Sequence, residues 1–134
     1  MNVAVIDKLA WIHIRDKKIL MTRSRGKDTW YIGGGKREQG ESDSEALIRE
    51  VKEELTVDLM PHTIKHMDTF EAQAHGKPAG TIVRMTCYTG DYVGVVRPAA
   101  EIEEIAWFAY GDKGKTAPVD KIIFDWLKKQ NLIS

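Results

Sequence analysis

Three glutamates, Glu50, Glu53 and Glu54, stand at spacings that bring their side chains together if the segment is helical. Residues three and four apart are neighbours on a helix, and like charges there destabilise it by roughly 0.2–0.5 kcal/mol per pair. A divalent cation reverses that energy, because hard ions such as Mg²⁺ take oxygen ligands. The spacing therefore indicates a metal-ligand set, with a solvated acidic face as the alternative.

Three consecutive glycines, Gly33-Gly34-Gly35, precede these glutamates. A run of glycines is typical of a backbone that needs unusual dihedral angles or has a close neighbour. Such a loop also leaves backbone groups free beside a metal and lets a phosphate approach closely. The combination of loop and carboxylates favours a metal site that handles phosphates over a plain acidic surface.

The segment that carries the glutamates has a strong helix signature. Ser42 followed by Glu45 is a capping-box pattern, and we expect the helix to run from there to about Leu55. Its apolar face comprises Leu47, Ile48, Val51 and Leu55. On the adjoining side, Glu45 and Arg49 form an i, i+4 pair with the acid first, which is the favourable order. Arg49 is also suited to hold the carboxylate of Glu50 by a charge-assisted hydrogen bond.

The remaining pattern predicts strands and one further helix. Runs rich in β-branched and aromatic residues predict strands at Val3–Ile14, Lys18–Arg23, Trp30–Ile32, Ile64–Ala74, Thr81–Tyr88 and Ile105–Tyr110. The first two are expected to form a hairpin around Arg15-Asp16-Lys17, and Pro118 is expected to open the second helix. The predicted fold class is α/β, with one mixed sheet flanked by helices, in a single domain of residues 1–134.

The charge balance excludes some classes of partner. Lysine plus arginine and aspartate plus glutamate both number 20, so no net charge attracts a nucleic-acid polymer or a membrane surface. Cys87 is the only cysteine, which excludes an internal disulfide. The apolar runs fall well short of the roughly 20 residues that span a bilayer. We therefore expect a cytoplasmic protein whose phosphate binding is local.

The loop and the first helix together match a known motif. Gly35 is followed after five residues by Glu41, and after seven more by Arg49-Glu50-Val51-Lys52-Glu53-Glu54. This pattern, over residues 35–57, resembles the Nudix box, the signature of the Nudix hydrolase family. The resemblance implies an α/β/α sandwich and the hydrolysis of a nucleoside diphosphate linked to another group, with water attacking phosphorus.

The resemblance also implies roles for particular positions. The cation-binding positions of such enzymes, which take Mg²⁺ or in its place Mn²⁺, correspond to Gly34 through its carbonyl and to Glu50, Glu53 and Glu54. By the same resemblance, Glu41 and Arg49 support the loop and orient the ligands.

A general base is the remaining catalytic role. In some members of the family a glutamate from a late loop, just before a strand that contains tryptophan, takes the proton of the attacking water. Glu101, six residues before Trp107, is the best match, with Glu103 and Glu104 as rivals. A carboxylate such as Glu53 is the alternative proton acceptor.

Two positions depart from the family pattern. Thr56 stands where glycine usually follows the paired glutamates, and threonine disfavours the left-handed backbone of a helix C-terminus. We therefore expect the helix to end differently here. Gly33 stands where proline usually precedes the glycines, which leaves the loop more flexible. Neither departure removes a carboxylate, so activity is expected to survive.

Substrate contacts are expected from the loops around the glycines. Basic residues cluster there, at Arg23, Arg25, Lys27, Lys36 and Arg37. We select Arg23, Lys36 and Gly35 as the substrate-binding candidates, with a plain surface role as the alternative for each basic side chain. Four aromatic rings are open candidates for stacking on a nucleobase, namely Tyr31, Phe70, Tyr88 and Trp107.

The sequence thus favours a metal-dependent pyrophosphohydrolase that acts on a nucleoside triphosphate or another nucleoside diphosphate derivative. The alternatives are a non-catalytic Nudix-fold domain that senses or binds a nucleotide, and a structural domain with an acidic helix. The retained carboxylates disfavour the first alternative, and the glycine run disfavours the second. The expected partner is a small nucleotide, and a monomer and a homodimer are both open.

Overall fold

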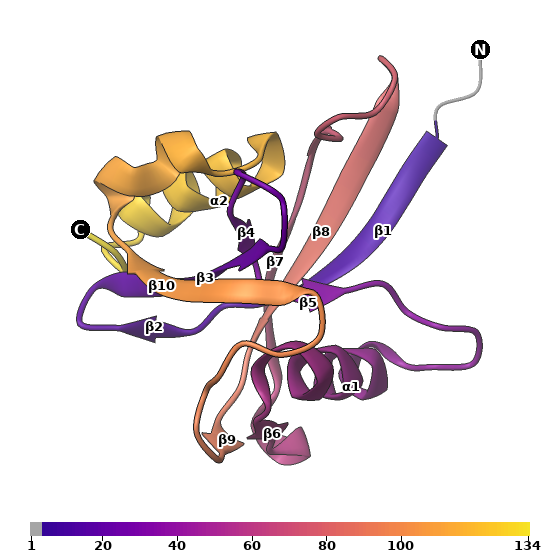
Figure 1. Ribbon diagram of the computed structural model, residues 1–134, viewed down its shortest axis with the longest axis vertical. Coiled ribbons are helices and arrows are strands. Elements are labelled where there is room, and N and C mark those ends of the chain that lie inside the picture. The colour runs from indigo at the N-terminus through magenta and orange to yellow at the C-terminus, as the bar shows by residue number, and fades with distance from the viewer. Residues whose placement is uncertain (1–3) are drawn as a thin grey trace.

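A computed structural model describes residues 4–134 (Figure 1). In these residues the larger sheet contains, in order, β5 (Gly34–Gly35), β1 (Ala4–Trp11), β8 (Thr81–Thr89) and β7 (Lys65–Gln73). The β1–β8 pair is parallel and the other pairs are antiparallel, so this sheet is mixed.

A second, antiparallel sheet lies beside the mixed sheet. It contains β10 (Ile102–Phe108), β3 (Lys18–Ser24) and β2 (Ile14–Arg15), with β4 (Tyr31–Ile32) also paired to β3. A short ribbon pairs β6 (Asp58–Leu59) with β9 (Tyr92–Val93), and single 3₁₀ segments occur at η1 (Pro61–Thr63) and η2 (Tyr110–Lys115). The expectation of one sheet is therefore wrong, because the described strands divide between these two sheets and the β6–β9 ribbon.

The helices α1 (Asp43–Leu55) and α2 (Pro118–Lys129) cover opposite sides of the mixed sheet (Figure 1). Two apolar clusters follow from this arrangement, one packed under each helix. The predicted α/β class and α/β/α sandwich are confirmed. Within residues 4–134 neither helix is long and apolar enough to cross a bilayer.

The predicted first hairpin is smaller than expected. Val3 lies outside the described residues, β1 ends at Trp11, and the hairpin joins only β2 to β3 through Asp16 and Lys17, both at positive φ. In β1, Leu9 and Trp11 face the α1 cluster while Ala10 faces the α2 cluster. A strand that is apolar on both faces is stable only in the middle of a covered sheet, so β1 pairs with β8 instead of β3.

Two other boundaries affect the site. The last strand begins at Ile102 and not at Ile105, and Tyr110 already belongs to η2. Glu103 and Glu104 therefore lie within β10, and only Glu101 precedes it. The two-residue strands β6 and β9 were not predicted, since such short segments carry no periodic pattern.

Helix α1 begins as predicted and ends in an unexpected way. The Glu45 N–H donates to the Ser42 Oγ at 3.2 Å and the Ser42 N–H to the Glu45 carboxylate at 3.0 Å, which confirms the capping box. At the other end Thr56 adopts the left-handed conformation, with φ of 64°, that glycine would take. The expectation that threonine would change the helix end is wrong, because the Thr56 hydroxyl donates to the Val95 carbonyl at 2.9 Å and holds that geometry.

Candidate functional site

The glycine run brings the backbone of β5 against both β1 and α1. Gly34 has φ of 145°, and a Cβ there would lie 2.0 Å from the Leu9 carbonyl oxygen. A Cβ on Gly35 would lie 2.4 Å from the Glu50 carboxylate. Gly34 excludes a side chain, and a side chain at Gly35 would displace Glu50, so the close-neighbour interpretation of the glycines is confirmed. The loop can therefore approach the carboxylates of α1 closely.

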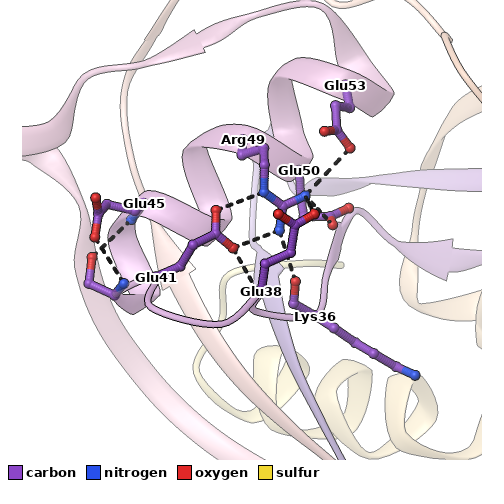
Figure 2. Close-up of polar contacts among 8 residues, drawn as sticks. Lys36, Glu38, Glu41, Glu45, Arg49, Glu50 and Glu53 are labelled. Carbon is purple, nitrogen blue, oxygen red and sulfur yellow. Dashed lines mark hydrogen bonds and ion pairs between the residues drawn. The ribbon is translucent and has the colours of Figure 1, made fainter.

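Arg49 organises the inner side of this loop (Figure 2). Its guanidinium donates two hydrogen bonds to the Glu41 carboxylate, at 2.7 and 2.8 Å, and one to Glu50 at 2.7 Å. A fourth bond, at 3.0 Å, goes to the carbonyl of Lys36. The Arg49 bonds, with help from the Glu38 N–H, lower the pKa of Glu41 to about 2. Arg49 thus joins the loop to a predicted metal ligand through fixed, charge-assisted bonds.

The expected pairing of Arg49 with Glu45 is wrong. In the described part of the chain the Glu45 carboxylate binds the Ser42 N–H in the capping box, and Figure 2 shows it at the far end of the helix from the guanidinium. The acidic partner of Arg49 is Glu41, because the side chain of Arg49 reaches across to the loop instead of running along the helix. Arg49 therefore forms a bidentate pair with the loop residue Glu41 instead of a pair along the helix with Glu45.

Glu53 is the most accessible of the three clustered glutamates. Its side chain is 53% exposed, and its nearest oxygen lies 3.5 Å from the Arg49 guanidinium. Lys36 contributes its carbonyl to Arg49, and its ammonium extends away from the cluster (Figure 2). Glu53 and the Lys36 ammonium are therefore open to a ligand arriving from solvent.

Glu54 lies in very different surroundings at the C-terminal end of α1. It is 8% exposed and accepts a hydrogen bond from the Gly34 N–H at 3.1 Å. Burial, and next the neighbouring Glu101 carboxyl, raise the pKa of Glu54 to about 8, and Glu50 adds to the effect. A buried carboxyl that faces two others favours either a proton or a cation, since each removes the repulsion.

The loop before β10 carries Glu101, the first of the three glutamates considered as the general base. The backbone N–H of Ala99 donates to the Glu54 carbonyl at 2.9 Å, and the Arg25 side chain donates to the Ala100 carbonyl at 2.7 Å. The first bond ties the loop to α1, the second ties it to the segment after β3, and Glu101 lies next to Glu54.

The two rival glutamates point elsewhere. Glu103 and Glu104 both bind the guanidinium of Arg23 on the neighbouring strand β3. Of the three late candidates, the structure therefore places Glu101 in the carboxylate cluster.

A cavity of about 330 Å³ begins at these carboxylates and extends between the sheets. Its lining includes Glu54, Glu101, Gly34 and Gly35, apolar side chains such as Ile6, Ile32, Val83 and Met85, and polar ones such as Lys8, Gln73 and His75. Of the four candidate rings, Tyr31 lines this cavity. The other three serve the protein itself, since Phe70 packs on Trp126, Tyr88 donates to Asp43 and Trp107 packs under Arg15.

Asp120 is a second buried carboxyl, which the sequence did not reveal. It is 0% exposed, and it lies in the first turn of α2, whose residues Ala117 to Val119 line the cavity. Burial raises its pKa to about 7, although Lys8 opposes that rise. Backbone N–H groups of Ala117 and Ile32 face the carboxyl, yet in residues 4–134 neither oxygen completes a hydrogen bond of normal geometry. An acidic residue in the first turn of any helix is ordinary, so its sequence position carried no signal.

The basic side chains near the glycines are mostly committed to protein partners. Thr22 and Ser24 line the cavity, and alternation along β3 turns Arg23 between them to the other face, where it meets β10. Arg37 binds Asp7 and Asp43. Two lysines that line the cavity, Lys8 and Lys77, were not among the predicted contacts.

A family model described as the NUDIX domain matches residues 8–127. This chain belongs to the Nudix family. The predicted family is confirmed, and the protein is a Nudix-type pyrophosphohydrolase, an enzyme that hydrolyses acid anhydrides of phosphorus.

Individual proteins and solved structures are similar to this chain. The uncharacterized Nudix hydrolase YvcI of Bacillus subtilis (strain 168) is 27% identical over 116 residues, which are 85% of this chain and 73% of that protein. The solution structure of the E. coli ORF135 protein has a TM-score of 0.73 at 26% identity, covering 94% of this chain and 92% of that one. The MutT Nudix hydrolase of Burkholderia pseudomallei shares the fold, with a TM-score of 0.73 at 22% identity over 90% and 96% of the two chains.

Nudix hydrolases use divalent metal ions, and the donor set of this enzyme fits one. Within residues 4–134 no three His, Cys, Asp or Glu side chains form a group that could by itself hold a metal ion. Mg²⁺ does not require one, because it keeps several waters and binds through one or two carboxylates together with substrate phosphates. Glu50 and Glu54 flank the glycines, and burial together with the neighbouring Glu101 carboxyl raises the pKa of Glu54.

Proposed function

We propose that this Nudix hydrolase cleaves a phosphoanhydride bond in a nucleoside triphosphate or a related nucleoside diphosphate derivative, with Mg²⁺, or Mn²⁺ in its place. One observation carries the proposal: a single cavity joins an apolar compartment that contains Tyr31 to the carboxylates of Glu54 and Glu101. Such a cavity suits a ligand with a flat base at one end and phosphates at the other.

The apolar end of the cavity supports binding of a nucleobase. Tyr31 offers a ring, and Ile6, Val83 and Met85 offer apolar contacts. Asp120 is fully buried in the turn of α2 that follows the lining residues Ala117 to Val119, and within residues 4–134 neither of its oxygens has a hydrogen-bond partner.

The carboxylate end supports binding of the cation and the phosphates. Glu50, Glu53, Glu54 and the Gly34 carbonyl are the proposed ligands. A bound cation would neutralise charge on the phosphates and lower the pKa of a water. Gly35 lets a phosphate approach the backbone, and the exposed side chain of Lys36 follows it in the loop. Arg23 would reach a phosphate only by leaving Glu103 and Glu104.

Proton transfer is assigned to a carboxylate next to the cation. Glu101 is the preferred base because it lies at the cavity beside Glu54, and the exposed Glu53 is the alternative. Arg49 does not take the proton; it holds Glu50 in place through Glu41 and the Lys36 carbonyl. A base must lie within reach of the attacking water, directly or through one further water.

The decisive experiment measures phosphate and pyrophosphate release from nucleoside triphosphates, dinucleoside polyphosphates and nucleotide sugars, with and without Mg²⁺. We expect metal-dependent turnover of at least one class and a rate loss of at least about 10²-fold in Glu53→Gln, which keeps the shape of the side chain and removes its charge. Nucleotide binding without turnover would instead support the non-catalytic alternative. Unchanged turnover in Glu53→Gln would refute its role.

The cellular setting follows from the chemistry of a small, reduced protein. We propose a cytoplasmic enzyme, active as a monomer or a homodimer, that takes small nucleotides and not a nucleic-acid polymer or a membrane. The free thiol of Cys87 is buried, which supports a reducing compartment without demanding it.

A further inference from the structure

We propose that Arg37 is a positioning residue that fixes the start of the loop between β5 and α1 and thereby holds Gly35 against Glu50. The inference rests on the proposed function, because it assigns Arg37 a part in the same site. It also replaces the phosphate-binding role that the basic loop suggested for this residue.

The first contact of Arg37 is an ion pair with Asp7, just beyond the last backbone pairing of β1 with β5. In the antiparallel β1–β5 pair, Leu9 lies opposite Gly35. Two residues back along β1 is Asp7, and two residues on from Gly35 is Arg37. Their side chains meet as an ion pair at 2.8 Å, at the register the ladder would have if it continued. This pair holds the chain against β1 where backbone pairing has ended.

The second contact joins the same guanidinium to the start of α1. One amino group of Arg37 binds Asp43, the first residue of the helix, while the other binds Asp7. The remaining oxygen of Asp43 accepts the hydroxyl of Tyr88 on β8. A planar guanidinium can bridge two carboxylates in this way, which a lysine ammonium on a single flexible stem does less well.

Arg37 and Arg49 therefore hold the loop from opposite sides. Arg49 binds the Lys36 carbonyl and Glu41 on the side of the metal ligands, and Arg37 binds β1 and the helix start on the other side. Gly35 lies directly before this doubly held segment, and its backbone leaves no room for a Cβ beside Glu50. A small shift of the segment therefore changes the position of a proposed ligand.

The test separates positioning from phosphate binding through steady-state kinetics. We expect Arg37→Ala to lower kcat by about tenfold and to leave the nucleotide KM within about threefold, since it misplaces a ligand without removing a substrate contact. Asp7→Asn should lower kcat in the same direction by less, and adding it to Arg37→Ala should cause little further loss. Arg37→Lys should recover part of the rate.

Arg84→Ala is the matched control. Arg84 lies opposite Asp7 in the β1–β8 register, but its guanidinium binds Glu71 on β7 at 2.6 Å. This variant removes an arginine and a cross-strand ion pair without touching the loop, so kcat should not change. A fall in kcat equal to that of Arg37→Ala would overturn the proposal.

Amide hydrogen exchange gives a readout that does not depend on activity. Exchange of residues 36–42 should become faster in Arg37→Ala and Asp7→Asn and stay the same in Arg84→Ala. Unchanged exchange, or a raised nucleotide KM with normal kcat and a silent Asp7→Asn, would overturn the proposal and return Arg37 to phosphate binding. If the wild-type enzyme turned over no nucleotide, the proposed function would fail while the exchange data still decided the loop contact.

Discussion

Two regions along α1 differ in how their carboxylates are paired. In the middle of the helix and the adjoining loop, Glu41 and Glu50 share the guanidinium of Arg49, which lowers the pKa of Glu41 to about 2. At the C-terminal end, Glu54 lies buried beside Glu101 and accepts a hydrogen bond from the Gly34 backbone N–H, and its pKa is raised to about 8. Both regions belong to one motif, yet among the described residues an arginine neutralises the carboxylates of the first region alone.

This difference separates support from ligand binding. A carboxylate that already has a bidentate arginine gains little from a cation and is suited to hold the loop. A buried carboxyl without a counter-charge is strongly stabilised by a cation, because the cation offsets both the desolvation cost of burial and the repulsion by a neighbouring carboxyl. The comparison therefore predicts that variants of Glu41 and Glu54 will differ in kind, with rigidity lost at Glu41 and activity lost at Glu54.

The largest effect on kcat is expected from removing the ionisable carboxyl of Glu54. Glu54→Gln should lower kcat by at least about 10²-fold, because it removes a proposed metal ligand, while the folded protein stays at least as stable at pH 7.5. Glu41→Gln should lower the thermal midpoint and reduce kcat by only about tenfold, since it loosens Arg49 and leaves the ligands in place. Kinetics and thermal unfolding of the two variants side by side check this. Equal losses of activity would break the comparison.

A smaller loss is expected where the loop meets the helix. Gly35→Ala places a Cβ 2.4 Å from the Glu50 carboxylate, so either the ligand or β5 must move. We expect kcat to fall by about 10- to 100-fold and the Mg²⁺ concentration for half-maximal rate to rise. Gly111→Ala is the control, because a Cβ at Gly111 meets nothing within 4 Å. Normal Mg²⁺ dependence in Gly35→Ala would show that this contact does not matter.

The pH dependence of stability should have opposite signs at the two ends. The lowered pKa of Glu41 means that its stabilising contribution is present above the ordinary value of 4.5 and is lost as the pH falls toward 2. The raised pKa of Glu54 means that the folded protein binds its proton more tightly than the unfolded chain does. Its contribution is therefore present below pH 4.5 and is lost as the pH rises to about 8.

Without divalent cation, the thermal midpoint should consequently fall between about pH 5 and pH 8. Glu54→Gln should reduce this fall in the thermal midpoint. Asp120→Asn should reduce it further, because the pKa of Asp120 is raised to about 7. Thermal unfolding across this range in a chelating buffer is the measurement. A midpoint that rises with pH in the wild type would contradict both assignments.

The smallest effect is expected at the helix end next to Glu54. Thr56→Ala keeps the positive φ but loses the hydroxyl bond to Val95, which should cost about 1 kcal/mol in the free energy of unfolding. Thr56→Gly loses the same bond and also relieves about 1 kcal/mol of backbone strain, so it should be close to neutral. Urea unfolding resolves the two. If glycine were as destabilising as alanine, strain at Thr56 would not be a factor.

Features that depend on neighbouring residues were predictable from the sequence. The capping box of Ser42 and Glu45, the apolar face of α1 and the start of α2 at Pro118 follow from helix geometry and local hydrogen bonds, and all were confirmed. The hairpin of β7 and β8 was also predicted almost to its ends. The organisation of residues 1–134 as a single domain stays a prediction from the sequence.

Features that depend on strand register were not predictable. Arg23 stands among basic loop residues in the sequence, but the β3–β10 pairing sets it opposite Glu104 and away from the cavity. Glu101, Glu103 and Glu104 look equivalent along the chain until the start of β10 separates them. The burial of Asp120 likewise depends on how α2 lies over the sheet.

The amino-acid sequence by itself determined the acidic set on α1, the arginine beside it and the glycines before it, because the spacing of residues on one helix fixes which side chains are neighbours. Only the tertiary structure decided which carboxylates are neutralised, which late glutamate joins them and which arginines serve the loop. Most of those outcomes depend on partners that lie on other elements of the fold, and a strand shifted by one position would turn every one of its side chains to the opposite face.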